Sequence, residues 1–325
     1  MGISSLFGGS ADTTPADHPA TPVLSVAIPN DSKKLFCCRV LGGGDDVVTP
    51  SRNEKRRAWK QLEKQMAMVP GGSVPMVSAD PIEDIEHPDN NRRAKMELFD
   101  ASSFYMDRMT VTCGEYALFV RNGGYADLNL WPNVVWAHIV QFVDQSGAPG
   151  PRNWNNGRPP REWMDHPVTG ICWYEARAYA RWVGKSLPTP VQWQRACTWH
   201  TNVDGRYSNK MYPWGDLFDP QRANLWGSGL GQTVPVDSHY EGCTPNGIAQ
   251  MIGNVWEWVD AAYAGDESPE YASGGLCEIR GGAYDTYFPR QATCQFRTGQ
   301  PRLFRPGNTG FRCCVEVDDL KHRVS

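Results

Sequence analysis

The distribution of apolar and polar positions divides the chain into a polar N-terminal part and one long folded domain. Residues 1–55 are rich in Ser, Thr, Pro, Asp and Gly, and their one apolar patch runs from Leu35 to Val40. Because so little apolar area cannot offset the chain entropy, we expect a mostly disordered extension in which this patch forms a strand or a docking segment. Residues 53–66 place the apolar side chains of Trp59, Leu62 and Met66 on one side of a charged sequence, which predicts a linker helix that we assign to 56–67.

Short apolar segments between chain-breaking residues predict one irregular domain over residues 68–317, followed by a tail over 318–325. Strand patterns lie on both sides of a Gly-Gly turn at the start of this domain and again at Phe104–Val111. Helix-start signals and apolar spacing predict three short helices, which follow Thr112, span Tyr174–Gly184 and follow Thr189. The strands and helices do not alternate as they do around a parallel sheet, so the fold class is α+β with little regular secondary structure.

Composition and charge narrow the class of protein. The chain has 325 residues, of which 40% are hydrophobic, so a wholly disordered or fibrous protein is excluded. Its 13 Trp, 32 Gly and 25 Pro indicate a core of large flat side chains held by loops. A net charge of −4 gives no reason to expect nucleic acid or an anionic membrane as a partner. With no spanning apolar run and no export signal at the N-terminus, we expect a soluble, cytoplasmic protein.

The ten cysteines are expected to be reduced thiols, because a chain of this length can bury a core without disulfides and two of the pairs are adjacent residues. Neither a Cys-x-x-Cys pair nor a His-Glu-x-x-His run occurs, so the sequence gives no support for a zinc site or a histidine-rich iron site. Cys172 precedes the second helix, where a thiol can be reactive, but a buried inert thiol is the favoured interpretation.

Successive motifs of the domain resemble those of the formylglycine-generating enzyme (sulfatase-modifying factor) family over about Met68 to Val317. In order, the motifs are MVPGG, FYMDRMTVTCGEYALFV, HPVTGICWYEARAYARWVGKSLPTPVQWQRA, YPWG, RANLW, TVPVDS, PNGIAQMIGNVWEWV, RGGAYDTY and NTGFRCC. The resemblance implies a C-type-lectin-like fold of the formylglycine-generating-enzyme type, held by tryptophans and bound calcium. The same fold also serves sulfoxide-forming iron enzymes, inactive relatives and hypervariable ligand-binding proteins, so the site must decide the activity.

The residues at the family's active site differ from those of the oxidase branch. In that branch, two cysteines five residues apart bind copper(I) and engage the substrate thiol, as soft thiolates can. Aligned from Gly281 and Gly282, these cysteine positions hold Thr286 and Gln291, neither of which forms a thiolate. The iron-dependent relatives take histidine ligands from a preceding helical domain, whereas only His18 lies among the residues before position 67 here. The resemblance therefore implies no catalytic residues, and we expect neither copper nor iron.

Calcium is the one cofactor that the resemblance favours. Gln250, Gly253, Val255 and Glu257 match a family calcium site made of a side-chain oxygen, two backbone carbonyls and a carboxylate. Gln250 replaces the usual Asn or Asp, which weakens the site, and an empty hydrogen-bonded loop is the alternative.

The C-terminal segment is a candidate ligand-binding surface, because aromatic and Arg side chains supply much of the contact energy in interfaces. Its candidate residues are Tyr284, Asp285, Tyr287, Phe288, Arg290, Arg302, Phe304 and Arg305. The alternative is that part of this segment is core and the rest is solvated loop. In retroelement-diversified members of the fold, the corresponding stretch is the variable ligand-binding region.

Two functional hypotheses follow. The first is a catalytically inactive relative that binds a small ligand or a protein partner through this surface, with a retroelement-diversified variable protein as a special case. The second is a divergent metal-dependent oxidoreductase acting on thiol substrates, in which Cys277, Cys294 or a partner subunit supplies the missing ligands.

Overall fold

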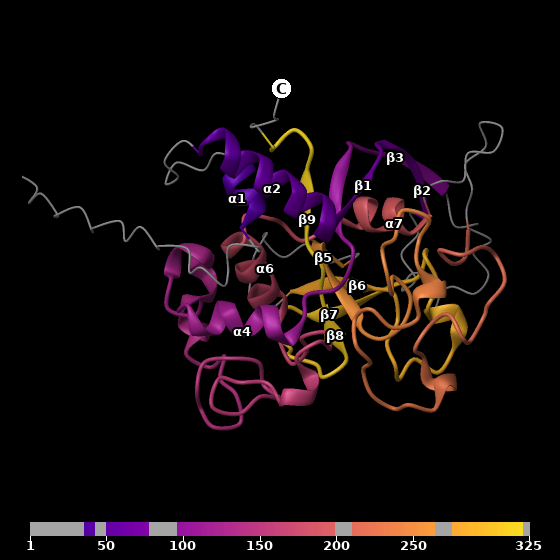
Figure 1. The fold of residues 1–325 in the computed structure, drawn as a ribbon. Coiled ribbons are helices and arrows are strands. Elements are labelled where there is room, and N and C mark those ends of the chain that lie inside the picture. Colours follow the sequence, from indigo (N-terminus) through magenta and orange to yellow (C-terminus); the bar gives the residue numbers. More distant parts are fainter. Residues whose placement is uncertain (1–35, 43–49, 78–95, 199–209, 264–274, 321–325) are drawn as a thin grey trace, which may run out of the picture.

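The computed structural model describes residues 36–42, 50–77, 96–198, 210–263 and 275–320 (Figure 1). The expectation of disorder for residues 1–35 lies outside the described residues, as does most of the predicted tail. None of the helices in the described ranges combines the length and the apolar character that crossing a bilayer requires.

The N-terminal part of the described chain forms two helices that pack onto the domain. Helix α2 (Arg52–Gln65) begins with a capping box in which the Ser51 backbone N–H donates to Glu54 and the Glu54 N–H donates to the Ser51 hydroxyl. Helix α1 (Cys37–Gly42) lies in the apolar patch, so of the two expected forms, a strand or a docking segment, the strand is wrong. Its buried residues Cys37, Cys38 and Leu41 share a cluster with α2 and with the end of the chain, and that packing favours a helix whose one face is apolar.

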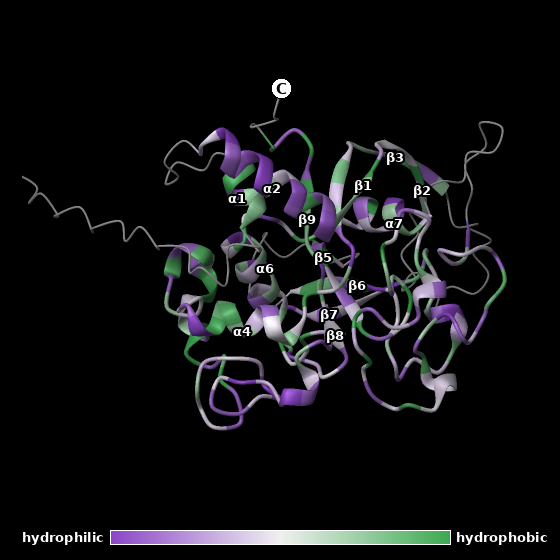
Figure 2. Cartoon of the chain, viewed as in Figure 1, coloured by the Kyte–Doolittle hydropathy of each residue, from purple (hydrophilic) through white to green (hydrophobic). Residues whose placement is uncertain are grey.

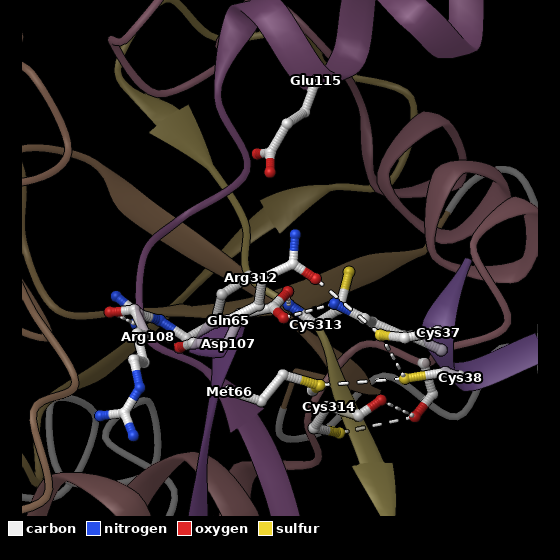
Figure 3. A network of polar contacts seen from close by, with 12 residues as sticks. Cys37, Cys38, Gln65, Met66, Asp107, Arg108, Glu115, Arg312, Cys313 and Cys314 are labelled. Atoms are coloured by element: carbon white, nitrogen blue, oxygen red, sulfur yellow. Dashed lines mark hydrogen bonds and ion pairs between the residues drawn. The ribbon is translucent and has the colours of Figure 1, made fainter. Parts of the chain in front are cut away.

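A polar and sulfur-rich contact region joins α1 to the body of the domain (Figure 3). The Cys38 Sγ lies 3.9 Å from the Met66 Sδ, where α2 ends and the first strand begins. Beside it, the Asp107 carboxylate accepts the Cys313 backbone N–H at 3.0 Å and pairs with Lys185. Helix α1 is therefore part of the folded unit.

Within the described ranges, the strands form three small sheets. The first contains β1 (Met66–Val69), β4 (Phe104–Asp107) and β9 (Cys314–Glu316), and the second contains β2 (Gly72–Val77) and β3 (Met96–Ala101). The third runs in the order β7 (Arg297–Pro301), β6 (Leu276–Arg280), β5 (Trp256–Ala262) and β8 (Thr309–Gly310), in which only β5 and β8 are parallel. The two strands predicted around the Gly-Gly turn are present, but they belong to different sheets because each finds its partner further along the chain.

The three predicted helices are α4 (Cys113–Arg121), α6 (Trp173–Trp182) and α7 (Pro190–Thr198). Thr112 and Glu115 cap α4 reciprocally, and Thr189 and Gln192 do the same for α7. Between α4 and α6 the chain forms α5 (Trp136–Ile139) and the 3₁₀ turns η1 (Leu128–Leu130), η2 (Asn133–Val135) and η3 (Arg161–Trp163). The 3₁₀ turns η4 (Trp226–Ser228), η5 (Tyr240–Gly242) and η6 (Pro289–Gln291) follow α7.

Aromatic side chains fill the core, as the composition indicates. Trp154, Trp173, Trp182 and Trp258 belong to one buried cluster and Trp193 to a second. Helix α2 consists mostly of hydrophilic residues (Figure 2). Trp226 does not follow the expectation that the tryptophans are core residues, because its side chain is 56% exposed.

Candidate functional site

The candidate site is the loop that follows β6 and starts at a tight double-glycine turn. Gly281 and Gly282 have φ angles of +94° and +79°, a conformation that favours glycine. A Cβ on Gly281 would lie 2.7 Å from the Met251 carbonyl oxygen, so the turn also depends on the missing side chain. The turn directs the chain from the four-stranded sheet toward residues 284–291.

Thr286 and Gln291, which the resemblance aligns with the cysteine positions of the oxidase branch, have local structural roles. Thr286 is buried, and its hydroxyl accepts the Ala283 backbone N–H at 2.8 Å, closing a turn. The Thr286 backbone carbonyl accepts a hydrogen bond from the Trp226 backbone N–H at 3.3 Å. Gln291 is half-buried at the end of η6. Neither side chain carries a sulfur donor.

The nearby Cys294 forms a disulfide with Cys197, which corrects the expectation that all the cysteines are reduced thiols. The two Cα atoms lie 5.8 Å apart, and both residues are in the same buried cluster. The disulfide links the end of the loop to the last turn of α7. The Cys294 sulfur, which the oxidoreductase hypothesis assigned to a metal ion, is therefore used in this bond. Cys277 is buried within β6.

Three aromatic rings and one Arg form a continuous exposed group, which we call the aromatic surface: Trp226, Tyr287, Phe288 and Arg290. The exposed fractions of the three aromatic side chains are 56%, 64% and 48%. The ring centroids of Trp226 and Tyr287 are 6.2 Å apart, and those of Tyr287 and Phe288 are 5.0 Å apart. The Arg290 guanidinium lies 5.3 Å from the Phe288 ring centroid, within the range of a cation–π contact.

Tyr284 and Asp285 lie at the start of the loop. Tyr284 is half-buried, and burial, followed by the neighbouring Asp285 carboxylate, raises the pKa of its phenol. The Asp285 carboxylate accepts the Asn308 amide at 3.0 Å, which links the loop to the segment before β8. Phe304 is also exposed, in a turn closed by its N–H to the Pro301 carbonyl.

Arg302 and Arg305 are buried, so the expectation that they line a ligand surface does not fit the structure. The Arg305 guanidinium donates two hydrogen bonds to Glu175, from Nε to Oε2 and from Nη2 to Oε1, each at 2.8 Å. Tyr125 donates to the same carboxylate at 2.6 Å. Sequence reasoning missed this pairing because Glu175 is on α6, far away along the chain.

For Trp226 the sequence favoured a core position, with an aromatic ligand surface as the alternative, and the structure places it at the surface. It follows Leu225 and precedes the segment Gly-Ser-Gly-Leu-Gly, where no apolar periodicity distinguishes an exposed Trp from a buried one. Its neighbour Tyr287 lies 61 positions further along the chain. The glycine-rich context, which predicts a loop, was the only local signal.

Cys172 is the inert thiol that the sequence favoured. Burial, followed by the Glu175 carboxylate, raises the pKa of its thiol well above the ordinary value. The Glu175 carboxylate accepts the Cys172 backbone N–H at 2.8 Å, so it caps α6 instead of activating the sulfur.

The residues expected to bind calcium do not fit the ion. Both Glu257 oxygens accept hydrogen bonds from Arg312, at 2.7 and 2.8 Å, and one also accepts the Trp193 indole N–H at 2.8 Å. The Gln250 side-chain oxygen accepts the Asn254 amide at 2.6 Å. Because calcium needs free oxygen donors with net negative charge, a carboxylate paired with a buried guanidinium is a poor ligand. No step of the function proposed below uses calcium.

Metal donors of other kinds do not converge either. Throughout the described ranges, no three His, Cys, Asp or Glu side chains lie in a group that could hold a metal ion.

Comparison with known proteins gives the family. The sulfatase-modifying factor enzyme 1-like domain matches residues 51–317. A hercynine oxygenase of Mycolicibacterium thermoresistibile is 34% identical over 185 residues, which are 53% of this chain and 38% of the relative, so the chain spans well under half of that protein. The formylglycine-generating enzyme of Thermomonospora curvata is 29% identical over 310 residues, covering 80% of this chain and 96% of the relative. The inactive C-alpha-formylglycine-generating enzyme 2 of Bos taurus is 30% identical over 166 residues, covering 47% of this chain and 51% of the relative.

Among solved structures, the crystal structure of CarF superposes with a TM-score of 0.52 at 21% identity, covering 78% of this chain and 98% of CarF. This similarity shows the fold. The chain therefore belongs to the sulfatase-modifying factor enzyme 1-like family and has the C-type-lectin-like fold of the formylglycine-generating-enzyme type.

Proposed function

We propose that this chain is a catalytically inactive member of its family that binds a protein partner through the aromatic surface. The observation that carries the proposal is the presence of Thr286 and Gln291 at the two positions where the oxidase branch has cysteines. A hydroxyl and an amide are hard donors, whereas copper(I) selects soft thiolates. Without such a centre, the chemistry of the oxidase branch has no metal at which dioxygen reacts.

The local contacts support this reading of the site. The Thr286 hydroxyl is used in a turn and the Cys294 sulfur is used in a disulfide, so neither is free to replace a thiolate. One relative of the chain carries the name of an inactive formylglycine-generating enzyme, so loss of activity has a parallel in the family.

The exposure of the aromatic surface supports the binding half of the proposal. Trp, Tyr and Arg are the residues that dominate the binding energy of protein interfaces, and three such side chains lie together here with Phe288. Leaving these rings in water costs hydrophobic free energy that a partner would recover. A protein partner suits an exposed group of rings better than a small ligand, which prefers a concave pocket.

The experiment has an activity arm and a binding arm. The purified chain, supplied with copper(I), dioxygen and a cysteine-containing peptide, is expected to form no formylglycine. Thr286→Cys combined with Gln291→Cys restores the two sulfurs at the family spacing and is expected to give a new copper(I)–thiolate absorption. Formylglycine production by the unmodified chain would contradict the proposal.

The binding arm uses cross-linking in extracts of the source organism, followed by purification of the cross-linked protein and measurement of its affinity. Tyr287→Ala with Phe288→Ala is expected to abolish the complex, whereas Val140→Ala, an exposed apolar residue at the end of α5, is expected to leave it intact. Equal affinity of the two variants would contradict the assignment of the surface.

A divergent metal-dependent oxidoreductase is the second candidate, and the similarity to hercynine oxygenase favours it. Elemental analysis of the chain purified without added metal separates the candidates. Stoichiometric iron or copper together with dioxygen consumption on a thiol substrate supports the second candidate. Diversification of the loop stays a prediction, to be tested by a search for a near-duplicate of its coding segment beside a reverse-transcriptase gene.

A further inference from the structure

A hollow of about 490 Å³ lies between α2 and the first sheet, separate from the aromatic surface. Its walls come from one face of α2, from β1 and β4, and from the segment after β9; its lining residues are Arg56, Trp59, Lys60, Glu63, Met68, Tyr105 and Val317. Figure 1 shows α2 beside β1 and β9 in this part of the molecule. The volume lies within the range of small-molecule sites, roughly 300–1,000 Å³.

The floor of the hollow is apolar and aromatic. The rings of Trp59 and Tyr105 meet edge to face with centroids 6.2 Å apart, and both side chains are half-buried. Met68 interrupts the otherwise buried pattern of β1 with a side chain that is 47% exposed. Two fixed rings beside a flexible thioether make a surface on which a flat apolar group can lie.

The rim of the hollow is basic. Helix α2 contains six basic and two acidic residues, in a protein whose overall charge is −4. Arg56 and Lys60 are four positions apart and therefore lie on the same helix face, where two like charges repel each other. Neither forms a salt bridge with another described residue, and Glu63 is the single acidic side chain in the lining. An anion between the two cations would relieve their repulsion.

We propose that this hollow binds a small amphipathic anion, with a flat apolar body on Trp59, Tyr105 and Met68 and an acidic group between Arg56 and Lys60. The acidic group is a carboxylate, sulfonate or phosphate, because each accepts charge-assisted hydrogen bonds from guanidinium and ammonium groups. This site does not depend on the proposed function, since it shares no residue with the aromatic surface or with the loop after β6.

The probe for this site is 8-anilinonaphthalene-1-sulfonate, an aromatic sulfonate whose fluorescence rises in apolar surroundings. Titration of the full chain is expected to saturate at one probe per molecule and to quench tryptophan emission. Arg56→Gln with Lys60→Gln is expected to weaken binding by at least about 10-fold, because the variant loses the charge-assisted hydrogen bonds to the sulfonate.

The matched control is Arg57→Gln with Lys64→Gln, which removes the same charge from the same helix at exposed positions outside the lining. Its affinity is expected to stay within about two-fold of the unmodified chain, because screened surface charges contribute little. Met68→Ala tests the apolar floor and is expected to weaken binding without loss of the fold. Equal weakening in the two double variants, or a titration that never saturates, overturns the proposal.

Discussion

The two halves of the segment between Ala283 and Asn308 have opposite roles, although both are rich in aromatic and Arg residues. In the first half, Tyr287, Phe288 and Arg290 are exposed and touch one another. In the second half, Arg305 is buried in a two-point ion pair with Glu175. Residue type alone therefore does not identify a binding surface, because an Arg is a surface residue or a structural one according to whether a carboxylate meets it.

The largest expected difference between the halves concerns Arg305 and Arg290. Arg305→Ala leaves the buried Glu175 carboxylate without its cation, which is expected to cost about 3–5 kcal/mol of unfolding free energy. Arg290→Ala removes an exposed side chain and is expected to change stability by less than about 0.5 kcal/mol. Urea denaturation of both variants measures the difference, and comparable losses would contradict the division of the segment.

The second prediction concerns the disulfide that ends the exposed half. Cys197→Ala with Cys294→Ala removes a bridge between residues 97 positions apart and is expected to lower the unfolding free energy by about 2–4 kcal/mol. A reductant is expected to lower the melting temperature of the unmodified chain but not that of the double variant. Cys243→Ala, at a free and half-buried thiol, serves as the control. If the reductant leaves the melting temperature of the unmodified chain unchanged, the disulfide does not form.

The third prediction sharpens the role of the exposed half in binding. Phe288→Ala is expected to weaken the complex with the partner by about 2 kcal/mol, or roughly 30-fold, if this ring is a hot spot of the interface. Its effect on unfolding is expected to be small, because nearly half of the side chain is already in water. Isothermal titration and thermal unfolding of one variant measure both quantities. If Phe288→Ala lowers the stability but leaves the affinity unchanged, Phe288 has a structural role and is not part of the binding surface.

The smallest expected effect is that of calcium. Because Arg312 and Trp193 use the Glu257 oxygens, adding calcium or a chelator is expected to leave the melting temperature unchanged. A rise in the melting temperature with calcium, lost in Glu257→Gln, would show that the ion displaces Arg312.

Local signals in the sequence predicted the helices well. The caps at Thr112 and Thr189 act within three residues, so the sequence contains the whole interaction. The family motifs likewise predicted the fold, because a motif series records the arrangement of the core. The replacement of the active-site cysteines by Thr286 and Gln291 stays a prediction.

Contacts distant along the chain explain what the sequence did not predict. The patch that forms α1 was expected to be a strand or a docking segment. Its helical form was not predicted, because its burial depends on α2 and on Leu320. The disulfide and the Arg305–Glu175 pair join residues 97 and 130 positions apart, which no local pattern encodes. The contact of the exposed Trp226 with Tyr287 likewise joins residues that are far apart along the chain.

The most direct test of the account is the fate of a cysteine peptide incubated with this chain, copper(I) and dioxygen, followed by mass spectrometry, with an active formylglycine-generating enzyme treated in parallel. The account predicts an unmodified peptide in the presence of this chain and an aldehyde in the presence of the active enzyme. Aldehyde formed by this chain over many turnovers would contradict the claim that threonine and glutamine have replaced its catalytic thiols.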